Sequence, residues 1–227
     1  MKMLKILFLF ICINIYSQNS TGGQSQALYT NLGTGIFKNA KLEATHPLGS
    51  PYVINKFADA KVGTIDQIAK MRYNVYKDEF EFISPKNDTL ILDRVNDFID
   101  VKFVNSNIKY KLVNYLNLDE KYQYGYLINM YEKNEIGLFK KEIILLSDEK
   151  IARTSLERDI APQYSKSSDV YFLKNNGKIA EFPSNRKKLA KLYPDMKEVI
   201  EKFVKENKID FDIDADKIKI IDLLATF

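Results

Sequence analysis

The sequence predicts an α+β protein in which a large antiparallel β-sheet precedes a C-terminal segment of two to three helices. From about residue 52 to residue 183, short β-branched and aromatic runs are separated by polar turns, the pattern of strands joined by hairpins. The last 44 residues change to the helical period. Strands followed by a helical cap are the order of an α+β domain. We expect a β-meander that forms a curved sheet, an open barrel or a sandwich.

Alternation and turn residues place the strands. Residues 71–76 and 79–82 alternate apolar with polar side chains on either side of Lys77-Asp78, which predicts a hairpin. Asn176-Gly177 predicts another hairpin, because both residues tolerate the positive φ of a two-residue turn. Residues 152–168 contain charges and a proline, so we expect a connection there. The other runs of strand length span 89–92, 98–104, 110–116, 124–131, 136–139, 142–146, 170–173 and 178–182.

The C-terminal segment predicts three helices. Ser184 is a good N-cap for a helix over 185–192, and Pro194 suits the first turn of a second helix. A third helix is expected over about 214–225, with Asp214 as its cap. The second helix has one apolar stripe under a Lys/Glu face, formed by Met196, Val199, Ile200, Phe203 and Val204. The inner side of the third helix is formed by Ile218, Ile221 and Leu224.

The first residues predict a secretory signal peptide. Lys2 and Lys5 form a positive n-region, and residues 6–13 are an uninterrupted apolar run. This run is too short to span a bilayer as a helix but suits the h-region of a signal. We expect cleavage after Ser17 and a periplasmic, outer-membrane-associated or extracellular location. Cleavage would lower the net charge from +4 to +2, because two lysines and no acid are lost, and would also remove Cys12, the one cysteine.

The expected organisation has four parts, of which the last two form a single folded domain. The signal peptide covers 1–17 and a flexible polar leader covers 18–48; residues 18–35 of this leader are rich in Gly, Ser, Thr, Asn and Gln. Such a leader buries too little apolar surface to offset the entropy of ordering. The antiparallel β domain covers 49–183, and the helices of 184–227 are expected to pack on that same domain.

The composition limits the chemistry that the chain can perform. With 45% apolar and 28% charged residues, the balance is that of a globular protein, and a net charge of +4 is too mild to predict nucleic-acid binding. His46 is the single histidine, and no Gly-x-Ser-x-Gly elbow is present to complete a catalytic triad with it. We interpret His46 as a loop residue. We predict no catalytic, cofactor-binding or metal-binding residue and expect no cofactor.

The acidic run Asp210–Asp216 invites a comparison with a calcium-binding loop. An EF-hand loop beginning at Asp210 would have Ala215 in place of the glycine at position 6 and Ile221 in place of the glutamate at position 12. We therefore interpret Asp212, Asp214 and Asp216 as stabilising the start of the last helix. A weak ion site built from oxygen ligands stays open as an alternative.

Three further groups of residues could belong either to the solvent-facing surface or to a functional site. Glu79 and Glu81 share one face of a strand, but two acids on such a face are most often solvent-facing rather than a glycosidase pair. Basic side chains over Arg186–Lys191 form a helix face that could touch anionic lipid weakly. Tyrosines and lysines interleave over 109–133, which suits base or sugar stacking but also ordinary strand packing. These residues are Tyr110, Tyr115, Tyr122, Tyr124, Tyr126 and Tyr131 with Lys109, Lys111, Lys121 and Lys133.

Several phrases of the sequence resemble a group of uncharacterised exported, β-rich proteins of Bacteroidota. The phrases extend over most of residues 49–227, and the Ser17-Gln18 junction resembles the usual signal-peptide ending of that phylum. The resemblance implies export and carries no assigned activity. It is carried by 49–52, 72–76, 78–81, 125–126, 171–178, 186–189 and 206–209.

Three functions are compatible with these observations. The first is a non-catalytic envelope or periplasmic protein that binds an apolar or envelope-derived ligand, or a protein partner, and it predicts an apolar cavity or an exposed apolar patch. The second is a hydrolase of sugars or phosphoesters that uses carboxylates alone, and it predicts two or more acids converging in one cleft. The third is a structural or assembly role in the cell envelope.

The signal peptide yields the first testable prediction. The protein recovered from the cell that produces it should lack residues 1–17 and begin at Gln18, because signal peptidase removes such segments during export. Intact mass measurement checks this. An unprocessed chain found in the cytosol would contradict it.

Overall fold

The structure is a computed structural model that describes residues 47–65, 67–94, 100–154 and 156–226. The described residues belong to a compact unit that begins at Pro47. The predicted signal peptide, His46 and the predicted leader up to residue 46 lie outside them. Leu48 forms a parallel bridge with Gln163, so contacts with the folded unit begin just before the predicted boundary at residue 49.

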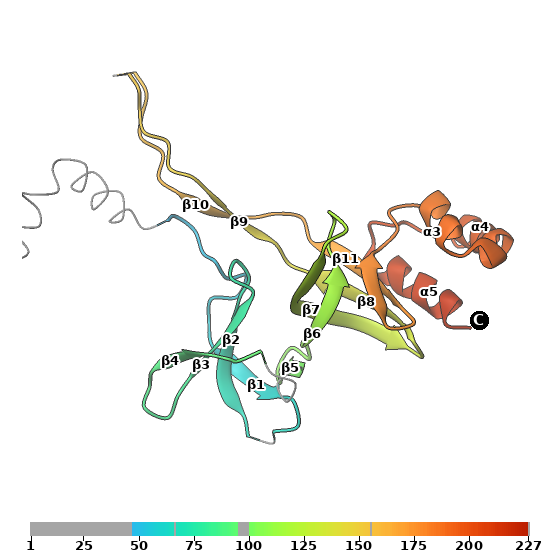
Figure 1. The fold of residues 1–227 in the computed structure, drawn as a ribbon, viewed down its shortest axis with the longest axis horizontal. Coiled ribbons are helices and arrows are strands. Elements are labelled where there is room, and N and C mark those ends of the chain that lie inside the picture. Colours follow the sequence, from blue (N-terminus) through green and yellow to red (C-terminus); the bar gives the residue numbers. More distant parts are fainter. Residues whose placement is uncertain (1–46, 66, 95–99, 155, 227) are drawn as a thin grey trace, which may run out of the picture. The chain divides into compact units, whose positions relative to one another are not determined.

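Ten strands form one open antiparallel sheet, which is followed by helices (Figure 1). The predicted α+β class is therefore confirmed. Along the sheet the order is β12-β11-β8-β7-β6-β5-β1-β2-β3-β4. The ten strands are β1 (Ala58–Val62), β2 (Ala69–Asn74), β3 (Glu79–Ile83), β4 (Thr89–Ile91), β5 (Asp100–Phe103), β6 (Lys109–Leu116), β7 (Tyr122–Lys133), β8 (Ile136–Lys141), β11 (Val170–Asn175) and β12 (Lys178–Glu181).

Both predicted hairpins are present. β2 pairs with β3 so that Tyr73 lies opposite Phe80. β11 pairs with β12 around Asn176 and Gly177, whose φ angles of 47° and 78° are those that the turn required. Alternation therefore located these strands well, because one face of each is buried and the other is partly solvated.

Two strands were not predicted. β1 carries two alanines and two charges, a composition with little β propensity, and its pairing with both β2 and β5 makes it a strand. It interrupts the expected meander by lying between β5 and β2. β10 (Gln163–Lys166) falls inside the predicted connection of 152–168, and is a strand because it pairs with β9 (Ile144–Ser147).

β9 and β10 leave the large sheet as a separate two-stranded ribbon (Figure 1). The bridge between Lys150 and Ile160 continues this pairing beyond the strands. Several apolar side chains of the ribbon and its tip are exposed, namely Leu145, Ile151, Leu156 and Ile160. The apolar ligand or protein partner expected from the sequence stays a prediction.

The helices are α3 (Arg186–Leu192), the 3₁₀ turn η2 (Pro194–Met196), α4 (Lys197–Glu206) and α5 (Asp214–Leu224). The predicted N-cap Ser184 is wrong by one residue, because Asn185 accepts the hydrogen bond from the Lys188 amide at 3.0 Å. Pro194 begins the 3₁₀ turn rather than α4. Asp214 also makes no side-chain cap, since it already lies within the first turn of α5.

Helices and strands pack into a core with three clusters. One joins the helices to β8 and β11, where Leu189, Ile200 and Ile221 pack against Leu138 and Leu173. A second contains Leu127, Phe139 and Phe172; Leu138 and Phe139 are consecutive, so they point to opposite faces of β8. The third contains residues of β1, β2, β3, β5, β6, β7 and β9; four of its twelve buried residues are aromatic and form the aromatic part of the core, namely Tyr73, Phe80, Tyr110 and Tyr126.

A charged cluster lies within the aromatic part of the core. The ammonium of Lys141, whose side chain is 11% exposed, forms an ion pair with Asp78 and donates to the Tyr126 carbonyl at 3.0 Å. Tyr73 donates its hydroxyl hydrogen to the same carboxylate. Burial lowers the pKa of Lys141, although Asp78 opposes that effect. Removing Asp78 would leave the Lys141 ammonium, which is largely buried, without its ion-pair partner, and such a loss costs several kcal/mol.

Gly125 leaves the space that the Asp78 carboxylate occupies. A Cβ atom added at Gly125 would overlap Oδ2 of Asp78. That carboxylate is fixed, because Arg94 contacts Oδ2 at 3.2 Å while Lys141 and Tyr73 hold Oδ1. A glycine inside a strand run is the sequence signal for such a close approach.

We predict that Gly125→Ala lowers the free energy of unfolding by about 2 kcal/mol, because the displaced carboxylate loses its hydrogen bonds. Urea denaturation measures this loss. The comparison background is Asp78→Gly, which accepts the positive φ of 59° at that position and removes the carboxylate; this variant is itself destabilised by the unpaired Lys141, so the cost of Gly125→Ala is measured relative to Asp78→Gly alone. In that background Gly125→Ala should cost much less; an equal cost in both backgrounds would contradict the packing explanation.

Candidate functional site

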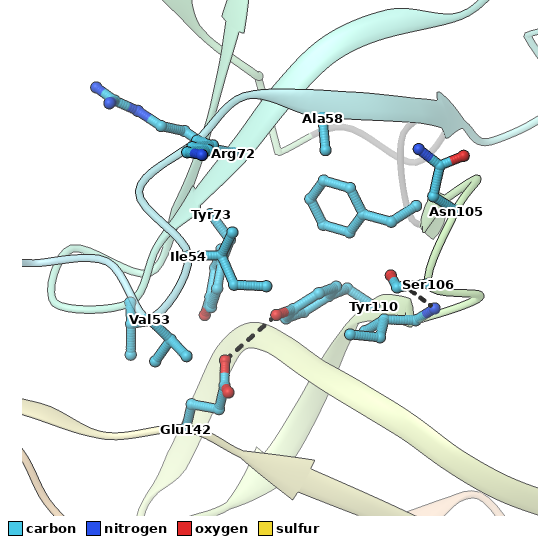
Figure 2. A pocket seen from close by; sticks show the side chains of 13 residues that line it. Val53, Ile54, Ala58, Arg72, Tyr73, Asn105, Ser106, Tyr110 and Glu142 are labelled. Carbon is cyan, nitrogen blue, oxygen red and sulfur yellow. Dashed lines mark hydrogen bonds between the residues drawn. The ribbon is translucent and has the colours of Figure 1, made fainter.

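A cavity of about 150 Å³ lies beside the aromatic part of the core (Figure 2). Residues from the loop before β1, from β1 and β2, from the β5–β6 hairpin and from the end of β8 form its walls. These walls are mostly apolar. The lining residues are Val53, Ile54, Lys56, Ala58, Arg72, Tyr73, Val75, Phe103, Asn105, Ser106, Ile108, Tyr110 and Glu142.

The loop of residues 50–57 forms one side of the cavity and is attached to β2. The backbone amide of Val75 donates to the Pro51 carbonyl at 3.0 Å. Arg72 fastens the rest of the loop, because its guanidinium carbon lies 4.1 Å from the ring centre of Tyr52 and 4.4 Å from that of Phe57. Val53 and Ile54 are thereby presented at the cavity while remaining 40% and 59% exposed.

Glu81 holds Arg72 in this position. Arg72 donates from Nε to Oε2 of Glu81 at 2.8 Å, and the Tyr52 hydroxyl donates to Oε1 at 2.8 Å. Burial opposes the charge of Glu81, but hydrogen bonds from Arg72, Tyr52 and Asn74 outweigh it and lower the pKa of this carboxyl. Glu81, which the sequence suggested was a solvent-facing acid, is instead the partly buried counter-ion of Arg72.

Aromatic rings form the cavity's inner wall. The ring centres of Tyr73 and Tyr110 are 4.8 Å apart, and those of Phe103 and Tyr110 are 6.1 Å apart. Phe80 supports them from behind, 4.9 Å from Tyr73 and 5.1 Å from Tyr110. These separations are typical of tilted and edge-to-face aromatic pairs, which hold one another in fixed orientations.

Glu142 is the one carboxylate among the residues that line this cavity. It follows β8 directly, where the chain leaves the large sheet for the β9–β10 ribbon. Figure 2 shows its carboxyl group facing Tyr110, whose hydroxyl donates to Oε2 at 3.3 Å. Burial raises the pKa of Glu142, and burial also raises the pKa of Tyr110.

Two cations also line the cavity. Arg72 pairs with Glu81, and in Figure 2 its guanidinium extends away from Tyr110 and Glu142. Lys56 is exposed to solvent. The cavity therefore combines three aromatic rings and one half-buried carboxylate with a neutralised arginine and an exposed lysine.

The other hollows near the helices are more polar. A pocket of about 260 Å³ is lined by Asp169, Glu181, Asp212 and Lys217 beside apolar side chains. Lys217 is 4% exposed, and its ammonium lies 3.9 Å from the ring centre of Tyr171. We interpret this lysine as part of the packing of α5 on β11. A wider hollow of about 880 Å³ borders the turns at Asn134 and Asn176 and the helix ends.

The other groups singled out by sequence do not converge. Of the tyrosines between 109 and 133, Tyr110, Tyr115 and Tyr126 are buried while Tyr122 is 74% exposed, so they form no single stacking surface. Lys109, Lys111 and Lys133 are paired with Asp100, Glu132 and Asp222. The basic side chains of 186–191 are exposed on α3, and their contact with lipid stays a prediction.

The acidic run acts only in part as predicted at the start of α5: Asp214 and Asp216 lie in its first turn, where carboxylates interact favourably with the helix dipole, but the helix has no side-chain cap. Asp216 accepts from the backbone amide of Asp210 at 2.9 Å and pairs with Lys219 at 2.7 Å, so it closes the turn before the helix. Within residues 47–226, as far as the structure describes them, no three His, Cys, Asp or Glu side chains gather as metal ligands would.

Sequence reasoning missed the residues that make the cavity. Tyr73 and Tyr110 were placed in strands, but Phe103, Val53 and Glu142 carried no signal of a common site. They come from separate segments, and the pairing of β1 between β2 and β5 brings these segments together. Gly125 was the one available cue, since it marks the close approach beside Tyr73.

None of the helices in the described part of the chain has the length and apolarity needed to cross a bilayer. Comparison of the chain with protein-family models, with curated proteins and with solved structures finds no match. The cavity's own chemistry is therefore the basis for a functional proposal.

The ion pair between Arg72 and Glu81 predicts a pH effect on stability. Because the pKa of Glu81 is lowered in the folded state, its stabilisation is present above its ordinary value of 4.5 and is lost as the pH falls through the folded-state pKa. Glu81→Gln should therefore cost about 1–2 kcal/mol near neutral pH and progressively less in acid.

Urea denaturation at a series of pH values measures this difference. Glu79→Gln is the matched control, since Glu79 lies on the same strand opposite Asn74 rather than opposite Arg72. A cost for Glu81→Gln that does not change with pH would contradict the assignment.

Proposed function

We propose that this protein is a non-catalytic, exported binding protein whose cavity accepts one compact apolar group of a small ligand. The observation that carries the proposal is the cavity of about 150 Å³ with walls formed by Tyr73, Phe103, Tyr110 and aliphatic side chains. Concave, mainly apolar sites with a few polar groups are where small molecules bind. The half-exposed Val53 and Ile54 would be covered by such a ligand.

The cavity volume limits the size of the ligand group that can bind. An engineered apolar cavity of roughly 150 Å³ in another protein binds benzene. The present cavity therefore suits a single ring or a branched group of four or five heavy atoms, such as a tert-butyl group. A larger ligand derived from the envelope would place only one group of this size inside.

The carboxylate-only hydrolase has less support. It requires two acids facing one substrate bond, whereas Glu142 is the one acid on the wall of this cavity. Glu79 and Glu81 do not supply a second acid, because Glu81 is paired with Arg72 and both lie on β3.

We predict that toluene and tert-butanol bind in the cavity and that filling it prevents this. In ¹H–¹⁵N spectra, both probes should shift amide signals of residues around Tyr73, Phe103 and Tyr110. Ala58→Leu should abolish these shifts, because the larger side chain occupies the space that Ala58 borders.

Lys61→Leu is the matched control. It adds a leucine to β1 at an exposed position on the opposite face of the strand from Ala58, so binding should persist. Probes that leave the spectrum unchanged, or that bind equally well to Ala58→Leu, would contradict the proposal.

A further inference from the structure

We propose that the group recognised in the cavity is an alkylammonium, primary or N-methylated, and that Glu142 supplies its counter-charge. The inference rests on the proposed function and adds the chemical class of the ligand. The observation that supports this inference is the arrangement of three aromatic rings and one carboxylate around a compact cavity.

A cation in the cavity would lie beside three aromatic rings. Tyr73, Phe103 and Tyr110 all line the cavity, and the ring centre of Tyr110 lies 4.8 Å from that of Tyr73 and 6.1 Å from that of Phe103. A cation within about 6 Å of an aromatic ring centre is stabilised by the ring's quadrupole, and ammonium groups with several methyl substituents are bound by cages of such rings. The trimethylammonium group has nearly the shape of tert-butyl, so the cavity's volume suits both.

Glu142 is the carboxylate available to such a cation. Its one hydrogen bond within the described residues is the 3.3 Å contact from Tyr110, and it has no ion pair there. Lys140 and Lys166 lie nearby, but both are 3.6 Å from Asp169, which partly neutralises them. An ammonium in the cavity would give the Glu142 charge a direct partner.

The same arrangement disfavours an anion. A carboxylate ligand would meet the charge of Glu142 and the negative faces of the rings. Arg72 and Lys56 also line the cavity, but the charge of Arg72 is neutralised by Glu81, and that of Lys56 is exposed to solvent, which screens it.

Two isosteric probes test the charge alone. Choline and 3,3-dimethylbutan-1-ol differ in one atom, a quaternary nitrogen in place of carbon. Choline should bind at least about tenfold more tightly in titrations followed by ¹H–¹⁵N spectra, the effect of a charge-assisted contact together with cation–π attraction. Betaine, which adds a carboxylate, should bind more weakly than choline.

Variants identify the side chains that cause the preference for choline over the neutral alcohol. Glu142→Gln should bring the two affinities close together by weakening choline, while the neutral alcohol still binds. Phe103→Leu should reduce the preference and keep an apolar wall. Glu79→Gln removes one acid from a strand outside the cavity lining and should leave the preference unchanged.

The preference should also depend on pH. Burial raises the pKa of Glu142 above 4.5; Asp169 raises it further, while Lys166, Lys140 and the Tyr110 hydrogen bond oppose this. Choline affinity is therefore highest above the pKa of Glu142 in the free protein, and it falls as the pH decreases through this pKa. The fall should occur at a higher pH than it would for a glutamate with an ordinary pKa. The affinity for the alcohol should not fall in this way. In the Glu142→Gln variant, the affinity for neither ligand should depend on pH.

The outcomes separate the two proposals. Equal affinities for choline and the alcohol would overturn the ammonium inference and leave the binding cavity in place. A preference that is undiminished in Glu142→Gln would overturn the role of Glu142. Absence of binding by every probe, toluene included, would overturn both.

Discussion

The buried ion pair between Asp78 and Lys141 is the constraint on which the rest of the site depends. Asp78 belongs to the turn between β2 and β3, and Lys141 is the last residue of β8. A buried charge that loses its partner is strongly destabilising, so these two parts of the sheet stay in fixed contact. Gly125 permits this contact, because any larger residue there would displace the carboxylate.

Tyr73 connects this ion pair to the cavity. Its hydroxyl donates to Asp78 and accepts from Lys141 at 3.3 Å, while the residue also lines the cavity beside Tyr110. Lys141 and Glu142 are consecutive but have different surroundings. The charge of Lys141 is neutralised inside the core, whereas Glu142 keeps one hydrogen bond at an apolar wall. If the proposed function holds, stability and ligand recognition depend on neighbouring residues, and a ligand could bind without disturbing the core.

The cavity is formed by elements that are far apart in the sequence, and this explains its rigidity. Its loop side is held by Arg72 through Glu81, Tyr52 and Phe57. Its inner wall is held by aromatic packing with Phe80. A site whose rings are fixed before the ligand arrives loses little conformational entropy on binding, so even a small group can be bound usefully.

The sequence by itself determined the α+β class, most strands of the sheet and the turn at Asn176-Gly177, because alternation and turn chemistry are local properties. It did not determine β1 or β10, since alanine and polar residues become strands there only through pairing with neighbours. The capping residues of α3 and α5 also differed from those predicted, because a capping residue depends on where the chain enters the helix. The cavity was decided by the tertiary structure alone: Phe103, Tyr110 and Glu142 carry ordinary strand signals, and only strand order and register bring them around one space.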